Sequence, residues 1–284
     1  MSERTNYSPG TPCWVDLGSP DLEASVDFYG ALFGWDVPES ENSQQTGGYR
    51  QAMKDGKPVA GMMPLMQEGQ PPAWSTYVSV DDAEATAAKV TDAGGTVIAE
   101  PMEVLDLGKM AIFADPTGVA FGIWQPGTFI GAGLVNEPGA ISWNELNTRD
   151  PETAKAFYGA VFGWTTLDLG SGQFWAMSAY GDYLEALTPG TRAQAAEFGA
   201  AGFEDVVAAI APLTAGDERA SWNVTFGTED ADATAAKATE LGGTVDVPPV
   251  DAAYSRFTVL RDPQGATFTA SAFVPENKDV GRAA

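Results

Sequence analysis

The chain contains no histidine among its 284 residues, and it has one cysteine and 15 basic side chains against 39 acidic ones. Without an imidazole the protein has no Ser/His/Asp or Cys/His relay and no His-ligated zinc or non-haem iron. The single thiol, Cys13, has no partner for an intramolecular disulfide, so the fold does not depend on an oxidising compartment. Acid–base chemistry therefore falls to carboxylates, tyrosine, lysine, hydroxyl and amide groups.

Basic residues are scarce, and the formal net charge is −24. This balance argues against a nucleic acid or an anionic membrane as partner, because binding there needs Lys and Arg to displace counterions. It favours cationic small molecules, although a solvated acidic surface explains the same excess. The longest purely apolar run, residues 206–211, is too short to span a bilayer, and the first ten residues lack the apolar core of a secretory signal. We therefore expect a cytoplasmic protein.

The sequence contains an internal duplication. Residues 14–35 match residues 143–164 at 11 of 22 positions, with a constant offset of 129. Residues 74–97 match residues 222–245 at 13 of 24 positions, with an offset of 148. Self-similarity over such lengths indicates that the chain consists of two related halves.

Each half divides again into two units that begin with a short alternating strand and continue into an amphipathic helix and further strands. The order is βαβββ four times over, which predicts an α+β protein of curved mixed sheets around cavities. The expected organisation is a first domain at 11–126, a Gly- and Pro-rich linker at 127–139, a second domain at 140–273 and a polar tail at 274–284.

The two halves differ most in one segment. Trp74 follows Pro64 by 10 positions, whereas Trp222 follows Pro189 by 33, which predicts an insertion at about 190–220. Within it, Phe203, Val206, Val207 and Ile210 recur at helical spacing, so we expect a helix there. That helix either packs against the body or an interface, or forms a lid over the second cavity.

The segments FYGALFGW, DDAEATAAKVTDAGGTV and DPTGVAFGIWQP, with their echoes in the second half, resemble the vicinal oxygen chelate superfamily. This superfamily includes glyoxalase I, bleomycin-resistance proteins and extradiol dioxygenases. The opening GTPCWVDL and the tandem layout are similar to an actinobacterial group that contains a mycobacterial culture-filtrate antigen. The resemblance implies two tandem domains, each built from two βαβββ modules.

Metal-dependent members of this superfamily take one ligand from each of four strands. Alignment with those positions gives the residues Trp14, Met62, Ser75 and Gly122 in the first half and Trp143, Leu187, Asn223 and Thr269 in the second. None of the eight is a His or a carboxylate, and hydroxyl and amide groups alone bind a divalent metal weakly. We therefore predict no metal site and no cofactor.

The expected cavities have tryptophan floors. Residues i and i+2 of a strand share a face, so Asp16 accompanies Trp14 and Glu145 accompanies Trp143. The expected ligand-binding residues are Trp14, Tyr49, Met62, Ser75, Trp124, Trp143, Asn147, Phe174, Asn223 and Thr269. Such a lining suits a flat, largely apolar ligand, and a carboxylate favours a cationic group on it. Alternatively, the two tryptophans plug the cavities as solid core, and the two carboxylates bond to their neighbours.

Three functions are compatible with these residues. The first is a metal-independent protein that binds a small molecule, by sequestration or carriage, as a monomer or homodimer. The second is a metal-free lyase, isomerase or cyclase in which Asp16 or Glu145 transfers protons, with Tyr77 as the acid partner. The third is an interaction scaffold whose surface includes the 190–220 insertion. Relatives labelled hydroxylase would need a metal or an organic cofactor for oxygen chemistry, and the residues indicate neither.

Overall fold

The computed structural model describes residues 3–39, 45–67, 69–169, 172–197, 202–213 and 220–280. The first half contains the strands β1 (Pro12–Ser19), β2 (Arg50–Lys54), β3 (Lys57–Pro64), β4 (Ala73–Ser79), β5 (Thr96–Val104), β6 (Gly108–Ala114) and β7 (Ala120–Pro126). Its helices are α1 (Leu22–Phe33) and α2 (Ala83–Asp92). The second half contains the strands β8 (Ile141–Thr148), β9 (Thr165–Asp168), β10 (Gln173–Ala176), β11 (Val206–Pro212), β12 (Ser221–Gly227), β13 (Thr244–Ala252), β14 (Ser255–Arg261) and β15 (Thr267–Phe273). Its helices are α3 (Pro151–Phe162), α4 (Tyr180–Leu187), α5 (Thr191–Glu197) and α6 (Ala231–Glu240), with two 3-10 turns, η1 (Phe203–Asp205) and η2 (Pro275–Asn277).

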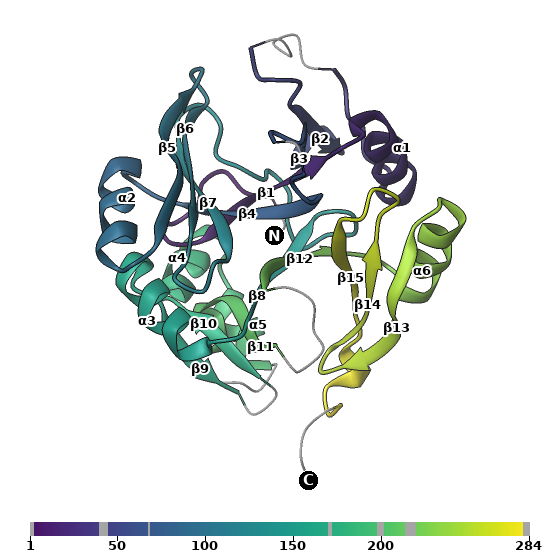
Figure 1. Ribbon diagram of the computed structural model, residues 1–284. Coiled ribbons are helices and arrows are strands. Elements are labelled where there is room, and N and C mark those ends of the chain that lie inside the picture. Colours follow the sequence, from purple (N-terminus) through teal and green to yellow (C-terminus); the bar gives the residue numbers. More distant parts are fainter. Residues whose placement is uncertain are drawn as a thin grey trace.

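Each half of the chain forms one mixed sheet (Figure 1). The strand order is β2-β3-β1-β4-β7-β6-β5 in the first sheet and β13-β14-β15-β12-β8-β11-β10-β9 in the second. The predicted α+β class, with two tandem units of mixed sheets, is confirmed. In the first module, an isolated bridge between Asp36 and Met53 stands where the other modules have a further strand.

The four module helices begin in the same way. Each follows an aspartate whose side chain accepts a hydrogen bond from the backbone N–H three residues on; these N-caps are Asp21, Asp82, Asp150 and Asp230. The carboxylate satisfies an orphan donor and favours the positive end of the helix. α1 and α3 end at Gly34 and Gly163, which have the left-handed conformation that glycine adopts easily. Within the described ranges, no helix combines the length and apolar character needed to cross a membrane.

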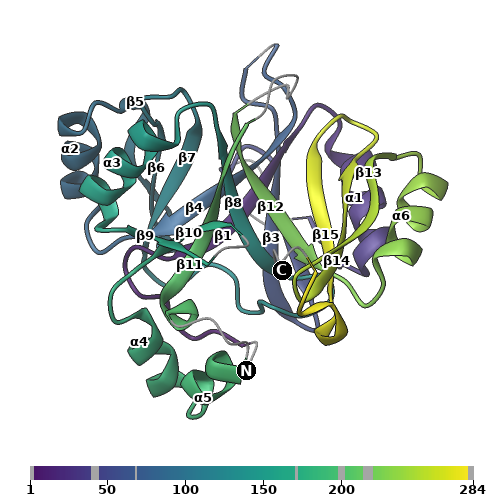
Figure 2. The same ribbon diagram turned by 90° about the horizontal axis from the view of Figure 1, so that it is seen from below.

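The helices pack crosswise between the halves. α1 lies beside α6 of the second half, and α2 lies beside α3 (Figure 2). Tyr29 of α1 is fully buried; its hydroxyl donates to Asp262 Oδ2 (3.0 Å) in the second half and accepts from Trp74 Nε1 (3.0 Å). Tyr29 belongs to the repeated FYG motif, and Asp262 begins a repeated DPxG turn. These motifs therefore join one half to the other.

The second joint repeats the first. Tyr158 of α3 donates to Asp115 Oδ2 (3.2 Å) and accepts from Trp222 Nε1 (2.9 Å). We expect Tyr158→Phe to lower the free energy of unfolding by about 1–3 kcal/mol, because it leaves a buried carboxylate oxygen and an indole N–H unpaired. Tyr183→Phe is the control, since the Tyr183 hydroxyl bonds Asn6 at the surface, and should change stability by less than about 0.5 kcal/mol. Urea unfolding measures both, and equal losses in the two variants would contradict the expectation.

The helix predicted from Phe203, Val206, Val207 and Ile210 is wrong. Val206–Pro212 is strand β11, which pairs in parallel with β8 as β3 pairs with β1. The run is apolar at nearly every position, and such a run does not distinguish a buried strand from a helix. Pro212, rather than Pro189, therefore matches Pro64. The additional residues precede β11 and form α4, α5 and η1, while 198–201 and 214–219 of the predicted insertion lie outside the described residues.

Candidate functional site

Strand register places the two tryptophan–carboxylate pairs at matching positions of the two sheets. Trp14 lies opposite Tyr77, and Asp16 lies opposite Ser75. In the second sheet, Trp143 lies opposite Thr225, and Glu145 lies opposite Asn223. Because residues opposite each other share a face, both pairs look onto the concave face of their own sheet.

The concave face of the first half is filled by aromatic side chains. Trp14, Tyr77 and Trp124 are 5%, 4% and 7% exposed. Phe129, from the segment that follows β7, packs perpendicular to Trp14 with ring centroids 5.0 Å apart, and at 5.8 Å from Trp124. These residues form a solid core. The first half therefore corresponds to the alternative in which the tryptophan fills the cavity.

Two tyrosine hydroxyls satisfy the polar groups in this closed half. The indole N–H of Trp14 donates to the Tyr49 hydroxyl at 2.7 Å. The Tyr77 hydroxyl donates to the carboxylate of Asp16, which is 5% exposed. Burial raises the pKa of Asp16 from 3.8 to about 7, and the hydrogen bond from Tyr77 only partly offsets that shift. Asp16 and Tyr77 are therefore neighbours, but both are enclosed.

Two glycines make room for these tyrosines. A Cβ at Gly61 would lie 1.9 Å from the Tyr49 hydroxyl oxygen, and one at Gly122 would lie 2.2 Å from the Tyr77 ring. The rings therefore lie directly on the backbone of β3 and β7. In the second sheet the matching positions carry Ala209 and Thr269, whose side chains prevent such close packing.

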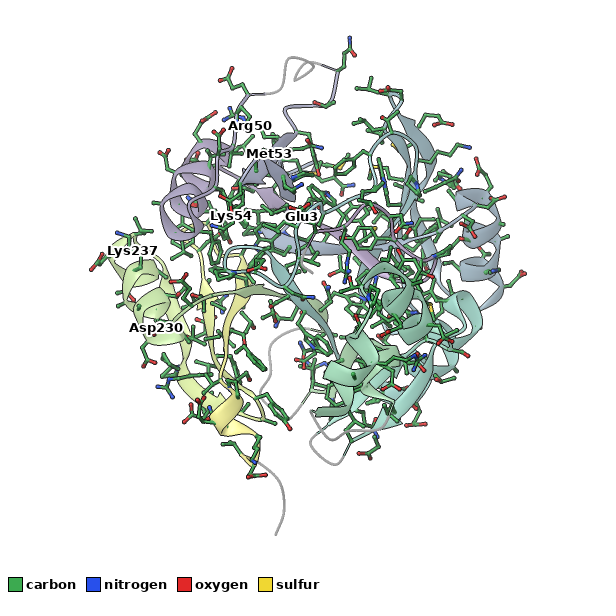
Figure 3. The ribbon with its side chains drawn as sticks, turned by 180° about the vertical axis from the view of Figure 1, so that it is seen from behind. Glu3, Arg50, Met53, Lys54, Asp230 and Lys237 are labelled. Carbon is green, nitrogen blue, oxygen red and sulfur yellow. The ribbon has the colours of Figure 1, made fainter. Side chains whose placement is uncertain are left out.

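Met62 does not lie at a cavity position, contrary to our expectation. It pairs with Leu17 on β1 and with Arg50 on β2, and Arg50 reaches Glu23 of α1. Figure 3 shows Arg50 and Lys54 on the strand next to α1. The alternation of side chains thus turns Met62 toward the helices, where it is fully buried. Ser75 is half-buried in the row of Asp16.

The second half has an open cleft of about 2390 Å³ on the corresponding face. Thr225 stands where the first half has Tyr77, and Ser271 stands where it has Trp124. Smaller side chains at these two positions leave the concave face unfilled. The predicted residues Trp143, Glu145, Asn147, Phe174, Asn223 and Thr269 all line this cleft.

Three aromatic side chains meet in the cleft. Phe174 lies 6.0 Å from Trp143 between ring centroids, with the rings at 73°. Phe203 of η1 is nearly parallel to Trp143, at 8° and 6.4 Å. Strand pairing makes Gln51, rather than Tyr49, the counterpart of Phe174, because Gln51 pairs with Gly61 as Phe174 pairs with Ala209. The sequence pattern missed Phe203 as a lining residue, because its spacing indicated a packed helix.

The polar groups of the cleft surround Glu145. Its carboxylate is half-buried and accepts a hydrogen bond from the side chain of Asn147. Burial raises the pKa of Glu145 above its ordinary value, and the bond from Asn147 lowers it by less. Asn223 Nδ2 donates to Thr269 Oγ1 at 2.8 Å. This arrangement offers one protonatable group and a few oriented dipoles beside an aromatic wall.

The rim of the cleft is acidic. Six carboxylates line it, namely Glu137, Glu145, Glu152, Glu229, Asp246 and Asp251. The two cations that line it are each paired with a carboxylate: Lys155 with Glu152 at 2.7 Å and Arg261 with Asp246 at 2.8 Å. The field in the cleft therefore attracts positive charge.

The side chains present do not fit a divalent metal. In the cleft, the ligand positions expected from the resemblance hold Trp143, Asn223 and Thr269, and the fourth falls on β11 at Ile210 or its neighbour Ala209. Leu187, our earlier candidate for that position, lies in α4 instead. Across the part of the chain that the structure describes, no three His, Cys, Asp or Glu side chains come together. A hydroxyl and an amide supply too few anionic or imidazole donors for such an ion.

A family model matches both halves of the chain. The model, described as the Glyoxalase/Bleomycin resistance protein/Dioxygenase superfamily, covers residues 13–123 and 140–269. These two matches contain the strands that form the two concave faces, apart from Pro12 of β1 and the last residues of β7 and β15.

Two groups of relatives match over nearly their whole length. CFP32 of Mycobacterium tuberculosis, which bears the provisional name glyoxylase, is 39% identical over 275 residues, covering 95% of this chain and 97% of CFP32. The anthracycline biosynthesis protein DnrV of Streptomyces peucetius is 39% identical over 280 residues, covering 93% of this chain and 94% of DnrV.

Solved structures of low sequence identity share the fold. The Mn(II)-bound glyoxalase from Novosphingobium aromaticivorans has a TM-score of 0.60 at 18% identity, covering 96% of this chain and 83% of that one. The 2,3-dioxygenase LapB from Pseudomonas sp. KL28 has a TM-score of 0.59 at 14% identity, covering 96% and 93%. At these identities the likeness extends to the arrangement of strands and helices.

Proposed function

Because the chain belongs to the glyoxalase/bleomycin resistance protein/dioxygenase superfamily, we propose that it is a metal-independent member that binds a flat, largely apolar small molecule. The binding site is the open cleft of the second half. The observation that carries this proposal is the contrast between the two halves. Aromatic side chains fill one concave face, whereas the other keeps a cleft of about 2390 Å³ with Trp143 on its wall.

The walls of the cleft favour a planar ligand. Trp143, Phe174 and Phe203 offer ring faces and edges within a few ångström of one another. Aromatic surfaces of this kind bind flat apolar molecules by stacking and edge contacts, and a few polar groups then fix the orientation. Glu145, Asn147 and Asn223 supply those groups.

The acidic rim favours a ligand with a positive charge or with hydrogen-bond donors. Both cations that line the cleft are already paired with carboxylates, and the lining carboxylates outnumber them, so the rim keeps an excess of negative charge. The names of DnrV and of DauV from Streptomyces sp. strain C5, which is 38% identical, refer to anthracycline biosynthesis. Anthracyclines are planar polycyclic compounds, and this supports a ligand of that shape.

Native mass spectrometry of the protein purified from its own source tests the proposal. We expect a co-purifying small molecule that absorbs as an aromatic compound and is recovered chemically unchanged. Adding it back to stripped protein should quench tryptophan fluorescence, and Trp143→Phe should reduce that quenching. Elemental analysis of the same preparation should find no stoichiometric transition metal. A bound metal, or a protein that neither carries nor binds any aromatic molecule, would contradict the proposal.

Glu145 also favours a second function, that of a metal-free enzyme of the lyase, isomerase or cyclase type. Its carboxylate opens to the cleft and has a raised pKa, as a general base or acid near neutral pH requires. Asp16 and Tyr77 are enclosed in the other half, so a substrate in the cleft does not reach them and we do not assign them a catalytic role. An enzyme would consume the co-purifying molecule, with a rate that rises with pH through the raised pKa of Glu145 when the carboxylate acts as a base and falls when the carboxyl acts as an acid. Glu145→Gln would abolish turnover while the fold survives.

A further inference from the structure

In the first half, aromatic side chains of the chain itself fill the concave face that is open in the second half. The ring of Phe129 stands perpendicular to that of Trp14, at 5.0 Å between centroids. The Tyr49 hydroxyl accepts the indole N–H of Trp14 at 2.7 Å, and the Tyr77 hydroxyl donates to Asp16. One ring and two hydroxyls therefore satisfy a tryptophan and a carboxylate that are two residues apart on a strand.

We propose that the ligand of the second half repeats these three contacts. An aromatic ring would stand against Trp143, a ligand oxygen would accept the Trp143 indole N–H, and a ligand hydroxyl would donate to Glu145. The side chains of the closed half thus serve as an internal copy of the proposed ligand. This inference rests on the proposed function, because it requires that the cleft bind a flat aromatic molecule.

The correspondence between the halves is fixed by hydrogen-bonded register. β1 pairs with β4 and β3 as β8 pairs with β12 and β11. Trp143 therefore has the place and facing of Trp14, and Glu145 has those of Asp16. A group that satisfies the pair in one sheet has a defined position relative to the pair in the other.

The occupants themselves are absent from the second half. Thr225 replaces Tyr77, and Ser271 replaces Trp124. Counting from the DPxG turns, Phe129 corresponds to Glu276, which is exposed in η2. The second sheet thus lacks the side chains of Tyr77, Trp124 and Phe129 at these positions but keeps the tryptophan and the carboxylate, while Phe174 and Phe203 contact Trp143 from other positions.

The retained groups have unmet bonding capacity. The Trp143 indole N–H makes no hydrogen bond to any of the described residues, and the side-chain hydrogen bond to Glu145 comes from Asn147. A carboxylate has about four acceptor positions, so Glu145 retains capacity for a further donor. In the open cleft these two groups are accessible to water, so a ligand that covers them without bonding them leaves them unpaired at a cost, whereas a ligand that supplies the partners avoids that cost.

The chemistry of the ligand follows from the copied contacts. It is a planar aromatic molecule with two oxygen substituents, at least one of which is a free hydroxyl. The oxygen near Trp143 is needed as an acceptor, whereas the one near Glu145 is needed as a donor. Methylation of the hydroxyls therefore preserves the first contact and removes the second.

Calorimetric titration with 2,6-dihydroxynaphthalene and 2,6-dimethoxynaphthalene at pH 8 tests this mode on the full chain. We expect the dihydroxy compound to bind at least about tenfold more tightly, the usual value of a hydrogen bond to a charged acceptor. In Glu145→Gln the preference should fall to about threefold or less, because the ionised acceptor is gone. Trp143→Phe keeps the ring but not the N–H, so it should weaken both compounds by similar factors.

Asp16→Asn is the matched control, since it makes the equivalent change in the closed half and should keep the tenfold preference. Equal binding of the two compounds to the wild-type protein would overturn this inference and leave the proposed function standing. A preference that survives in Glu145→Gln, or that Asp16→Asn removes, would also overturn it. Failure of both compounds to bind would count against this inference and the proposed function together.

Discussion

Asp16→Asn should stabilise the protein at pH 8 by about 3 kcal/mol and have little effect at pH 4. The folded state raises the pKa of Asp16 from 3.8 to about 7, because burial disfavours the carboxylate. Between these two values the folded protein holds a proton that the unfolded chain has lost. The free energy of unfolding therefore falls as pH rises through this window, and it stays at the lower level above pH 7.

The size of the gain follows from the width of that window. A shift of one pKa unit corresponds to about 1.4 kcal/mol, so a shift of about three units costs the wild-type protein about 4 kcal/mol above pH 7. The asparagine of the variant carries no charge, so the variant does not lose this stability. Its amide N–H group lacks an acceptor, however, and this lowers the free energy of unfolding by about 1 kcal/mol. Below pH 4 the wild-type carboxyl is protonated in both states, and the advantage disappears.

Urea unfolding at pH 8 and pH 4 measures this difference. Glu145→Gln provides the comparison, because its half-exposed carboxyl has a pKa raised in the same direction in an open cleft. Its gain at pH 8 should be the smaller of the two. An Asp16→Asn variant that is less stable than the wild-type protein at pH 8 would refute the expectation.

Removing the two equivalent tryptophans should have opposite consequences. Trp14→Ala opens a cavity beneath Phe129 and leaves the Tyr49 hydroxyl without its donor, so we expect a loss of about 3–5 kcal/mol in stability. Trp143→Ala removes a half-exposed ring from a solvent-filled cleft and should cost about 1 kcal/mol or less. The affinity for 2,6-dihydroxynaphthalene, by contrast, should fall at least about tenfold in Trp143→Ala.

Urea unfolding and calorimetric titration of both variants separate these effects. Should Trp14→Ala fail to fold, Trp14→Phe keeps most of the ring volume while removing the N–H, and its loss of about 1–2 kcal/mol gives the same comparison. That variant should bind the naphthalene probe as the wild-type protein does. A Trp14→Phe protein with unchanged stability and weakened ligand binding would reverse the assignment of the two halves.

Most of the fold could be predicted from the duplication. The FYG and DPxG motifs occur in both halves because each tyrosine bonds the turn aspartate of the other half, as Tyr29 does with Asp262. The alternation of side chains also placed Asp16 beside Trp14 and Glu145 beside Trp143 on their shared faces. These features depend on local period and on repetition, which a single sequence displays directly.

The parts that could not be predicted depend on long-range packing. Val206–Pro212 is apolar throughout, so only its pairing with β8 identifies it as a strand. Interpreting this segment as a helix shifts the predicted insertion and assigns Leu187, which lies in α4, to a strand position. Met62 was misplaced because its register with Leu17 is invisible in the sequence. The first half is closed because the Tyr77 ring packs onto the backbone of Gly122, 2.2 Å from where a Cβ would lie. This contact depends on how two strands pack in three dimensions, which the sequence does not display.

The crosswise joints also bear on how the two halves diverged. Because Tyr29 and Tyr158 each anchor the opposite half, neither half keeps a complete core when separated from the other. A duplicated pair bound in this way cannot lose a copy, yet under the proposed function a single cleft binds the ligand. Selection then acts on the first half mainly through the yield of folded protein. The second half can change its ligand specificity by substitution of a few residues in the cleft wall, such as Thr225, Ser271 and Phe203. Homologues should accordingly vary more at these three positions than at Tyr77, Trp124 and Phe129.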